Sequence, residues 1–213
     1  MRPNPTHQVT DVTFVRDLVA REGFATIVST TTAGPVASHY PIVLEDSGDG
    51  LVVLTHLGRP DERIHEIDAA AAAGREVLVI VQGPHGYVSP SWYSPGSSRA
   101  PTWNFTVAHL WGVPQVLTPE ENLDSLVALV AHFEQHVDEP MWLDRDWATP
   151  VARGTVGLQI PVTRLDVKAK LSQDKDPTSV QNVIDHLRAP GPYSDPALAA
   201  DMERARDEGT PAP

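Results

Sequence analysis

Residues 82–105 carry the side chains of this chain that are best suited to holding a flat, polar ligand. His85, Tyr87, Trp92 and Trp103 occur there among prolines and hydroxyl residues, in the runs QGPHGYVSPSWY and PTWNF. Aromatic faces on a backbone stiffened by proline, with hydrogen-bonding groups between them, are typical of a pocket wall for a planar ligand rich in heteroatoms. The alternative is a loop whose aromatic side chains only pack against one end of a core.

His132 and His136 have the spacing that places two rings on one face of a helix, as zinc proteases require. The acidic residue is not adjacent to the first histidine, however, and no third ligand is evident. We therefore expect a solvated helix face and no metal site. The chain has no cysteine, which excludes thiol catalysis, cysteine-based zinc sites and iron–sulfur clusters.

The chain also lacks the glycine-rich loops that cradle phosphates in dinucleotide-binding and P-loop proteins, and it lacks the serine of a nucleophile elbow. A nucleotide ligand would therefore need side chains to hold its phosphate. Fixed positive charge suits that task, because Arg makes bidentate contacts and Lys supplies a point charge. The candidates are Arg59, Arg63, Lys168 and Lys170.

The charge balance of the chain argues against tight DNA binding on its own. Among 213 residues there are 16 basic and 28 acidic ones, for a formal net charge of −12 at pH 7. Duplex DNA is a dense polyanion, and its regulators usually present a basic face. DNA remains a partner to test, although the acidic charge does not support it.

No apolar run approaches the length that spans a bilayer, and the first residues, MRPNP, are not followed by the apolar segment of a signal peptide. We expect a cytoplasmic protein with no membrane association. The length fits one domain with a sizeable core.

Alternating and β-branched patterns predict strands at residues 24–31, 36–44, 51–55, 77–82, 103–117 and 155–170. Helical spacing predicts helices at residues 12–22, 61–73, 119–133 and 177–187. Thr10 or Asp11 would cap the first helix, and Thr118 with Glu121 would form a capping box on the third. Tight turns are expected at 33–34 and 46–50.

These elements do not follow a regular β–α–β alternation, so they favour an antiparallel barrel over a doubly wound sheet. We expect a mainly β fold with flanking helices, of the α+β class. Residues 1–188 would form the domain. Residues 189–213 are rich in Pro, Gly, Asp and Glu, and we expect them to fray as a flexible acidic tail.

Three blocks of the chain, in this order, resemble those of the FMN-binding negative transcriptional regulators of the PaiB type. They are the run ASHYP at 37–41, the 82–105 segment, and the run KAKLSQ at 168–173 with Val183, Ile184 and Leu187 after it. The likeness covers about residues 1–188, with Phe105 in place of the usual tyrosine. It implies an antiparallel split β-barrel of the FMN-binding type, a homodimer, and FMN near the subunit interface.

The same resemblance implies that the FMN contacts come from these blocks and from residues 55–60. The residues implied are Ser38, His39, Thr55, His56, Arg59, Gln82, His85, Trp103, Asn104, Lys170 and Gln173. All three lysines of the chain, at 168, 170 and 175, fall within eight residues. They could equally form a solvated strand edge, and the resemblance favours Lys170 as a ligand. No catalytic residue is assigned.

Two classes of function stay open at this point. In the first, FMN is the ligand or redox sensor of a PaiB-type transcriptional regulator, acting directly or through a partner. In the second, the protein is an FMN-dependent oxidoreductase, passing electrons from a nicotinamide or deazaflavin donor to a small acceptor. Haem degradation, known in related split barrels, is a third. The low basicity favours the second class, whereas the resemblance favours the first.

Overall fold

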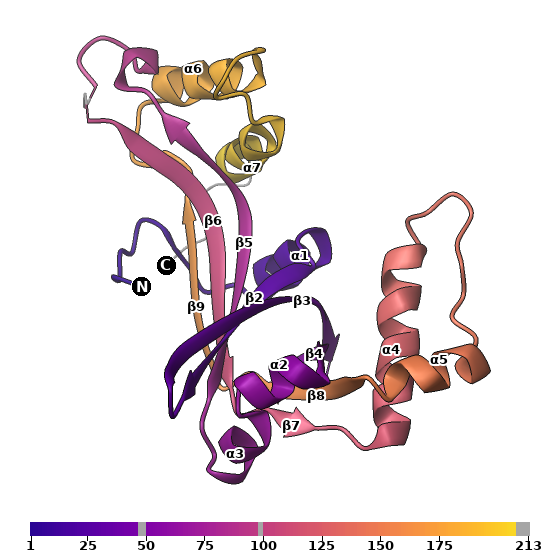
Figure 1. Ribbon diagram of the computed structural model, residues 1–213. Helices are drawn as coiled ribbons and strands as arrows, with labels where there is room; N and C mark the ends of the chain where they lie inside the picture. The colour runs from indigo at the N-terminus through magenta and orange to yellow at the C-terminus, as the bar shows by residue number, and fades with distance from the viewer. Residues whose placement is uncertain (47–49, 98–99, 208–213) are drawn as a thin grey trace. The chain divides into compact units, whose positions relative to one another are not determined.

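The computed structural model describes residues 1–46, 50–97 and 100–207 (Figure 1). The strands are β1 Gln8–Val9, β2 Phe24–Thr31, β3 Gly34–Asp46, β4 Leu51–Gly58, β5 Val77–Val88, β6 Thr102–Gly112, β7 Gln115–Val116, β8 Thr155–Pro161 and β9 Arg164–Lys170. The helices are α1 Val12–Arg21, α2 Arg59–Ile64, α3 Ile67–Ala72, α4 Pro119–Glu134, α5 Arg145–Ala152, α6 Pro177–Arg188 and α7 Pro196–Asp207, with a short 3₁₀ helix at Pro90–Trp92.

The strands form a nine-stranded sheet in the order β1-β9-β6-β5-β2-β3-β4-β8-β7. The expected antiparallel, mainly β architecture is confirmed. Within the described part of the chain no pairing joins β1 to β7, so the sheet is open rather than closed.

The chain divides into two compact units. Unit 1 comprises Met1–Val15, Gln82–Ala108 and Asp166–Pro213, and unit 2 comprises Arg16–Val81 and His109–Leu165. Strands β5 and β6 each run from one unit into the other.

Unit 2 is built on antiparallel pairs of long strands. β2 pairs with β3 from Phe24↔Pro41 to Thr31↔Gly34, and β4 pairs with β8 from Val52↔Pro161 to Gly58↔Thr155. Alternate residues point into the core and are buried, which is the two-residue period expected of strands. They include Ile27, Val53, Leu57, Leu158 and Ile160.

Helices α4 and α5 cover part of this unit and lie beside each other next to β8 (Figure 1). Leu129 of α4 packs on Val43 and Leu54 of the strands. Leu123 and Leu126 pack on Ala148 and Ala152 of α5. The predicted capping box is present: Thr118 Oγ1 accepts from the Glu121 N–H at 3.3 Å, and Glu121 Oε2 accepts from the Thr118 N–H at 2.8 Å.

In unit 1, β1 pairs with β9 through Gln8↔Lys168 and Val9↔Val167. Helices α6 and α7 pack together and bury Ile184, Leu187, Leu198 and Met202. Leu198 also lies against the backbone of β5, because a Cβ built on Gly86 would be 2.9 Å from Leu198 Cδ2. Glycine at position 86 therefore permits α7 to approach the strand closely.

Five expectations from the sequence need correction. The strand regions predicted at 103–117 and 155–170 are each two strands, β6 with β7 and β8 with β9. The helix predicted at 61–73 is two helices, because Glu66 between them has the left-handed φ of 51° and its carboxylate accepts from the Thr32 N–H at 3.2 Å. The strand predicted at 77–82 continues to Val88, so the run QGPHGYV is strand rather than loop. Residues 196–207 form α7 with buried apolar residues and do not fray as expected.

The turn predicted at 46–50 falls mostly on residues 47–49, which lie outside the described residues. No helix in the described ranges has the length and apolar character needed to cross a membrane.

Candidate functional site

A small cavity in unit 1 brings together the best candidates for binding an anion. Its volume is about 140 Å³. The lining residues come from the segment before β6, from the first residues of β6 and from the end of β9: Tyr93, Ala100, Pro101, Thr102, Asn104, Lys170, Ser172, Asp174 and Lys175. Two lysines thus face one cavity that has room for a small group.

Lys170 is half-buried at this cavity and donates a hydrogen bond from Nζ to Thr102 Oγ1. Burial lowers the pKa of Lys170, because it penalises the charged ammonium. Asp174 opposes this effect, while the charges of Lys168 and Lys175 add to it. An anion in the cavity would offset both the burial and the repulsion between the lysines.

Tyr93 contributes a buried hydroxyl that interacts only weakly with the nearby Ser172 side chain. Its side chain is only 8% exposed, and among the described residues its hydroxyl makes no hydrogen bond of normal geometry. Burial raises the pKa of Tyr93, so the phenol stays protonated near neutral pH and can donate. Buried polar groups in proteins normally have partners, so a ligand atom in the cavity would satisfy this one.

Ser172, which lines the cavity, has an unusual backbone conformation. Ser172 is 2% exposed and has a φ of 65°, in the left-handed region that residues other than glycine rarely adopt. The Asn104 amide, fully buried, donates to Ser172 Oγ at 2.9 Å and contacts Met202 Sδ at 3.4 Å. Strained residues that are held this firmly cluster at ligand sites.

The other residues that the sequence implied in unit 1 have different surroundings. Gln173 is used structurally: its side chain accepts from the Leu171 N–H at 2.7 Å and donates to the Ala169 carbonyl at 2.6 Å. Gln82 and His85 are exposed on β5, and His85 Nδ1 is 3.1 Å from the Gly83 carbonyl.

Trp103 was expected to be a buried wall, and this is wrong for unit 1 as described, because the side chain is 56% exposed. It belongs to a row of aromatic side chains in which neighbouring ring centroids lie 5.2 to 6.4 Å apart: Trp103, Tyr87, Tyr193 and Trp92. His186 stacks on Trp92 at 4.9 Å.

The implied residues of unit 2 lie on β3 and β4 and at the start of α2. His39 is exposed, 3.0 Å from Thr26 Oγ1 through Nδ1, and stacked on Phe24. Thr55 is fully buried and donates to the Pro41 carbonyl at 2.7 Å, which is a structural bond. Arg59 donates from Nε to the Arg153 carbonyl at 2.6 Å.

Among the unit 2 residues that the resemblance implies as FMN contacts, His56 has a buried ring nitrogen without a hydrogen-bond partner among the described residues. Its ring lies 5.9 Å from that of Tyr40, and its buried Nδ1 has no hydrogen-bond partner among the described residues. Burial lowers the pKa of His56, so the ring is neutral at pH 7 and can accept or donate one hydrogen bond. Ser38 shares a strand face with Tyr40, two residues on.

Sequence reasoning missed three residues that the geometry singles out. Tyr93 and Tyr40 both occur within the quoted blocks, but a tyrosine that packs and a tyrosine that binds give the same pattern. Ser172 also lies in a quoted block, and nothing in its sequence context signals a left-handed backbone. Lys175 was recognised as part of the lysine cluster but was not assigned to the site.

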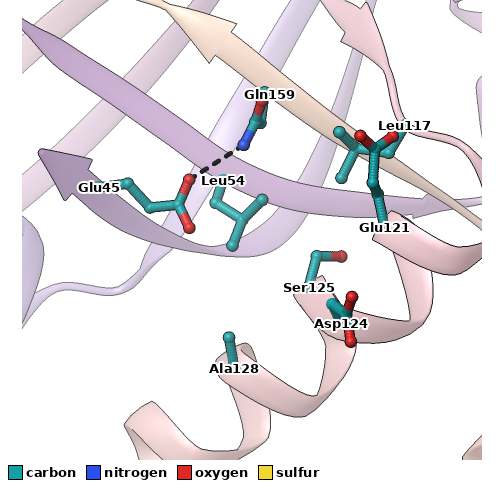
Figure 2. A pocket seen from close by; sticks show the side chains of 8 residues that line it. All are labelled: Glu45, Leu54, Leu117, Glu121, Asp124, Ser125, Ala128 and Gln159. Atoms are coloured by element: carbon teal, nitrogen blue, oxygen red, sulfur yellow. Dashed lines mark hydrogen bonds between the residues drawn. The ribbon is translucent and has the colours of Figure 1, made fainter. Parts of the chain in front are cut away.

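A larger cavity in unit 2, about 250 Å³, is unsuited to a phosphate (Figure 2). Glu121 and Asp124 reach it from α4, and Glu45 reaches it from β3, where Gln159 donates to Glu45 at 3.1 Å (Figure 2). None of its eight lining residues is basic. Its carboxylates would repel an anion.

Among residues 1–46, 50–97 and 100–207, no group of three or more metal-ligating side chains is positioned to hold a metal ion. The rings of His132 and His136 are 6.4 Å apart and perpendicular.

Comparison with known proteins points to flavin binding. The sequence model of the family described as "Putative FMN-binding domain" matches residues 1–164. The chain is 32% identical over 186 residues to the Protease synthase and sporulation protein PAI 2 of Bacillus subtilis, covering 85% of this chain and 86% of that protein.

Two solved structures share the fold. The FAD and heme binding protein from Mycobacterium smegmatis aligns with a TM-score of 0.57 at 19% identity, over 76% of this chain and 73% of that one. The flavocytochrome Anf3 from Azotobacter vinelandii aligns with a TM-score of 0.58 at 12% identity, over 76% and 68% of the two chains. The expected flavin-binding split-barrel fold is confirmed, as an open sheet.

Proposed function

Because the chain belongs to the family of FMN-binding domains and has FMN as its cofactor, we propose that it is a flavin-dependent regulator or sensor of the PaiB type. The relative from Bacillus subtilis, named for protease synthesis and sporulation, supports a regulatory role, since it matches most of both chains. The acidic charge of this chain favours an output through a partner protein rather than through direct DNA contact.

The observation that carries the proposal is the cavity with Lys170, Lys175 and the unsatisfied Tyr93 hydroxyl. Pockets that enclose a whole ligand have volumes of roughly 300–1,000 Å³. A cavity of about 140 Å³ therefore fits only the phosphate end of FMN. Lys170 and Lys175 would supply positive charge, and Tyr93 and Thr102 would supply hydroxyl donors.

The isoalloxazine ring supplies the redox chemistry when FMN is bound. The other FMN contacts implied by the resemblance stay predictions: Ser38, His39, Thr55, His56, Arg59, Gln82, His85, Trp103, Asn104 and Gln173. Of these, His56 has a buried ring nitrogen without a hydrogen-bond partner among the described residues.

We also propose that the protein is a homodimer with FMN near the interface, as the resemblance implies. Sedimentation equilibrium of the FMN-loaded protein tests this assembly. A single species of 23.1 kDa would contradict it.

Fluorescence titration of the purified full chain with FMN and riboflavin tests the phosphate contacts. Hydrogen bonds to charged groups contribute about 1.5–3 kcal/mol each, so FMN should bind at least about tenfold more tightly than riboflavin. Lys170→Ala and Lys175→Ala should reduce this preference. Lys168→Ala is the matched control, since Lys168 lies on the same strand but does not line the cavity. Equal affinities for FMN and riboflavin would contradict the assignment.

The regulatory role is tested in the host by transcript profiling of a deletion strain. Wild type and Lys168→Ala should restore the transcripts that change on deletion, whereas Lys170→Ala should not. A deletion that changes no transcript would contradict the regulator. Steady-state bleaching of bound FMN by NADH or NADPH would favour the oxidoreductase instead.

A further inference from the structure

A second cavity of unit 1, about 250 Å³ in volume, lies between the end of β9 and helices α6 and α7. Its lining residues are Leu171, Gln173, Lys175, Pro177, Val180, Met202, Ala205 and Arg206. All of them lie beyond residues 1–164, the part that the family description matches. The cavity thus lies outside the part of the chain that this family model describes.

The interior of this cavity is lined by buried apolar side chains. Leu171, Val180 and Met202 are buried, with exposures of 4%, 8% and 1%. Gln173 is fixed by two backbone hydrogen bonds, so its amide is not available to compete for a ligand. Such a lining suits a hydrocarbon group rather than a sugar.

The charged residues of this cavity are two cations. Lys175 Nζ lies 2.7 Å from Asp174, and Arg206 Nε lies 2.8 Å from Asp207. Both pairs are between adjacent residues and are at least partly exposed, and such pairs contribute little energy, so a ligand can compete for the cations. Because each cation already has one carboxylate beside it, the positive potential suits a monoanion better than a dianion.

We propose that this cavity binds a small apolar monocarboxylate, with its hydrocarbon part against Leu171, Val180 and Met202 and its carboxylate between Lys175 and Arg206. An aliphatic acid of about six carbons is a suitable probe. The carboxylate gains charge-assisted hydrogen bonds, and the chain leaves water.

Lys175 lines both cavities of unit 1, which couples the two sites. Two anions beside one ammonium share its single positive charge and repel each other. If the first cavity holds the FMN phosphate, as proposed above, a carboxylate in the second cavity weakens FMN binding, and FMN weakens carboxylate binding by the same factor. The second cavity is then an effector site for the flavin sensor.

Equilibrium dialysis of the FMN-free full chain with labelled hexanoate tests the binding site by itself. Saturable binding of one hexanoate per chain is expected. Unlabelled 1-hexanol should compete at least about tenfold less well, because it lacks the charge. Succinate, a polar dianion, should also compete poorly. Equal competition by hexanol, or no saturable binding, would overturn the proposal.

Variants test whether hexanoate binds in this cavity or elsewhere on the surface. Arg206→Gln should weaken hexanoate binding about tenfold. Arg188→Gln is the matched control, because Arg188 pairs with Glu203 and does not line the cavity. Ala205→Phe should fill the cavity and abolish binding, with an unchanged circular dichroism spectrum as proof of folding. Equal hexanoate affinity in Arg206→Gln and Arg188→Gln would overturn the carboxylate position.

A titration with FMN in the presence and absence of saturating hexanoate tests the coupling. Hexanoate should raise the Kd of FMN at least about threefold in wild type and not in Arg206→Gln. Binding of hexanoate without binding of FMN would refute the proposed function and leave the new site standing. Binding of FMN without saturable hexanoate binding would refute only the new site.

Discussion

A buried hydroxyl without a partner costs stability in the ligand-free protein, and Tyr93 carries one beside two lysines. Tyr40 in unit 2 is the contrasting case. Its hydroxyl donates to Asp61 at 2.5 Å and accepts from the Gly58 N–H at 3.1 Å. The same phenol group is therefore unsatisfied in one unit and doubly bonded in the other.

We predict that Tyr93→Phe leaves the stability of the FMN-free protein unchanged or raises it, because the hydroxyl makes no hydrogen bond of normal geometry and only a weak interaction with Ser172 is lost. The same substitution should weaken FMN binding about threefold to tenfold, since the donor to the phosphate disappears. Thermal melting and FMN titration measure the two effects.

Tyr40→Phe is the control, and it should cost about 1–3 kcal/mol of stability because it leaves the bonded groups of Asp61 and Gly58 without their partner. A Tyr93→Phe variant that melts as early as Tyr40→Phe would show that the Tyr93 hydroxyl is bonded after all.

At this scale the sequence indicated part of the candidate site. The resemblance favoured Lys170 over a solvated strand edge, and Lys170 does line the cavity, but its contact with FMN stays a prediction. Exposure could not be predicted: Trp103 lies in the same segment as Tyr93, yet one is 56% and the other 8% exposed. Tyr93 follows the 3₁₀ helix and Trp103 lies on β6, and the sequence does not show which of the two side chains the rest of unit 1 covers.

The helix caps are the elements that local sequence specifies best. Asp11 at α1, Thr118 with Glu121 at α4 and Asp176 at α6 each accept from a backbone N–H of the first turn. Such caps act within four residues, so they can be read locally. The break at Glu66 and the helix α7 depend on contacts with distant residues, Thr32 and Gly86, and could not be read in this way.

Asp176 makes the stability of α6 dependent on pH. Hydrogen bonds from Ser179, and from Ser94, lower its pKa to about 2 from the ordinary 3.8. A carboxyl with a lowered pKa contributes stability above the unfolded pKa and loses it as pH falls through the folded one. We therefore predict that this contribution is complete above about pH 4 and declines toward pH 2.

Urea unfolding at several pH values measures this decline. Asp176→Asn should keep an acceptor for the helix N-terminus and flatten the acid limb of the profile, whereas Asp176→Ala should lower the midpoint at every pH. If Asp176→Asn kept the full acid limb of wild type, the decline would have to come from other carboxyl groups.

The net charge of −12 belongs to the molecule as a whole and limits its partners. We predict that any specific DNA binding by the isolated protein is weak and falls steeply between about 50 and about 200 mM salt. Fluorescence anisotropy with a host promoter fragment, against a scrambled fragment of the same length, measures it. Nanomolar affinity for the promoter at physiological salt would show that a local basic surface outweighs the overall charge.

Unit 1 is assembled from three separate stretches of the chain, so its parts are synthesised at different times. Tyr93 leaves the ribosome long before Lys170 and Lys175, and α7 follows later still. Because synthesis proceeds at roughly 5–20 residues per second, the aromatic segment of residues 82–105 is made several seconds before helices α6 and α7. The two cavities of unit 1 can form only after residues 170–206 have been synthesised, so we expect FMN to bind after these residues are made and not before.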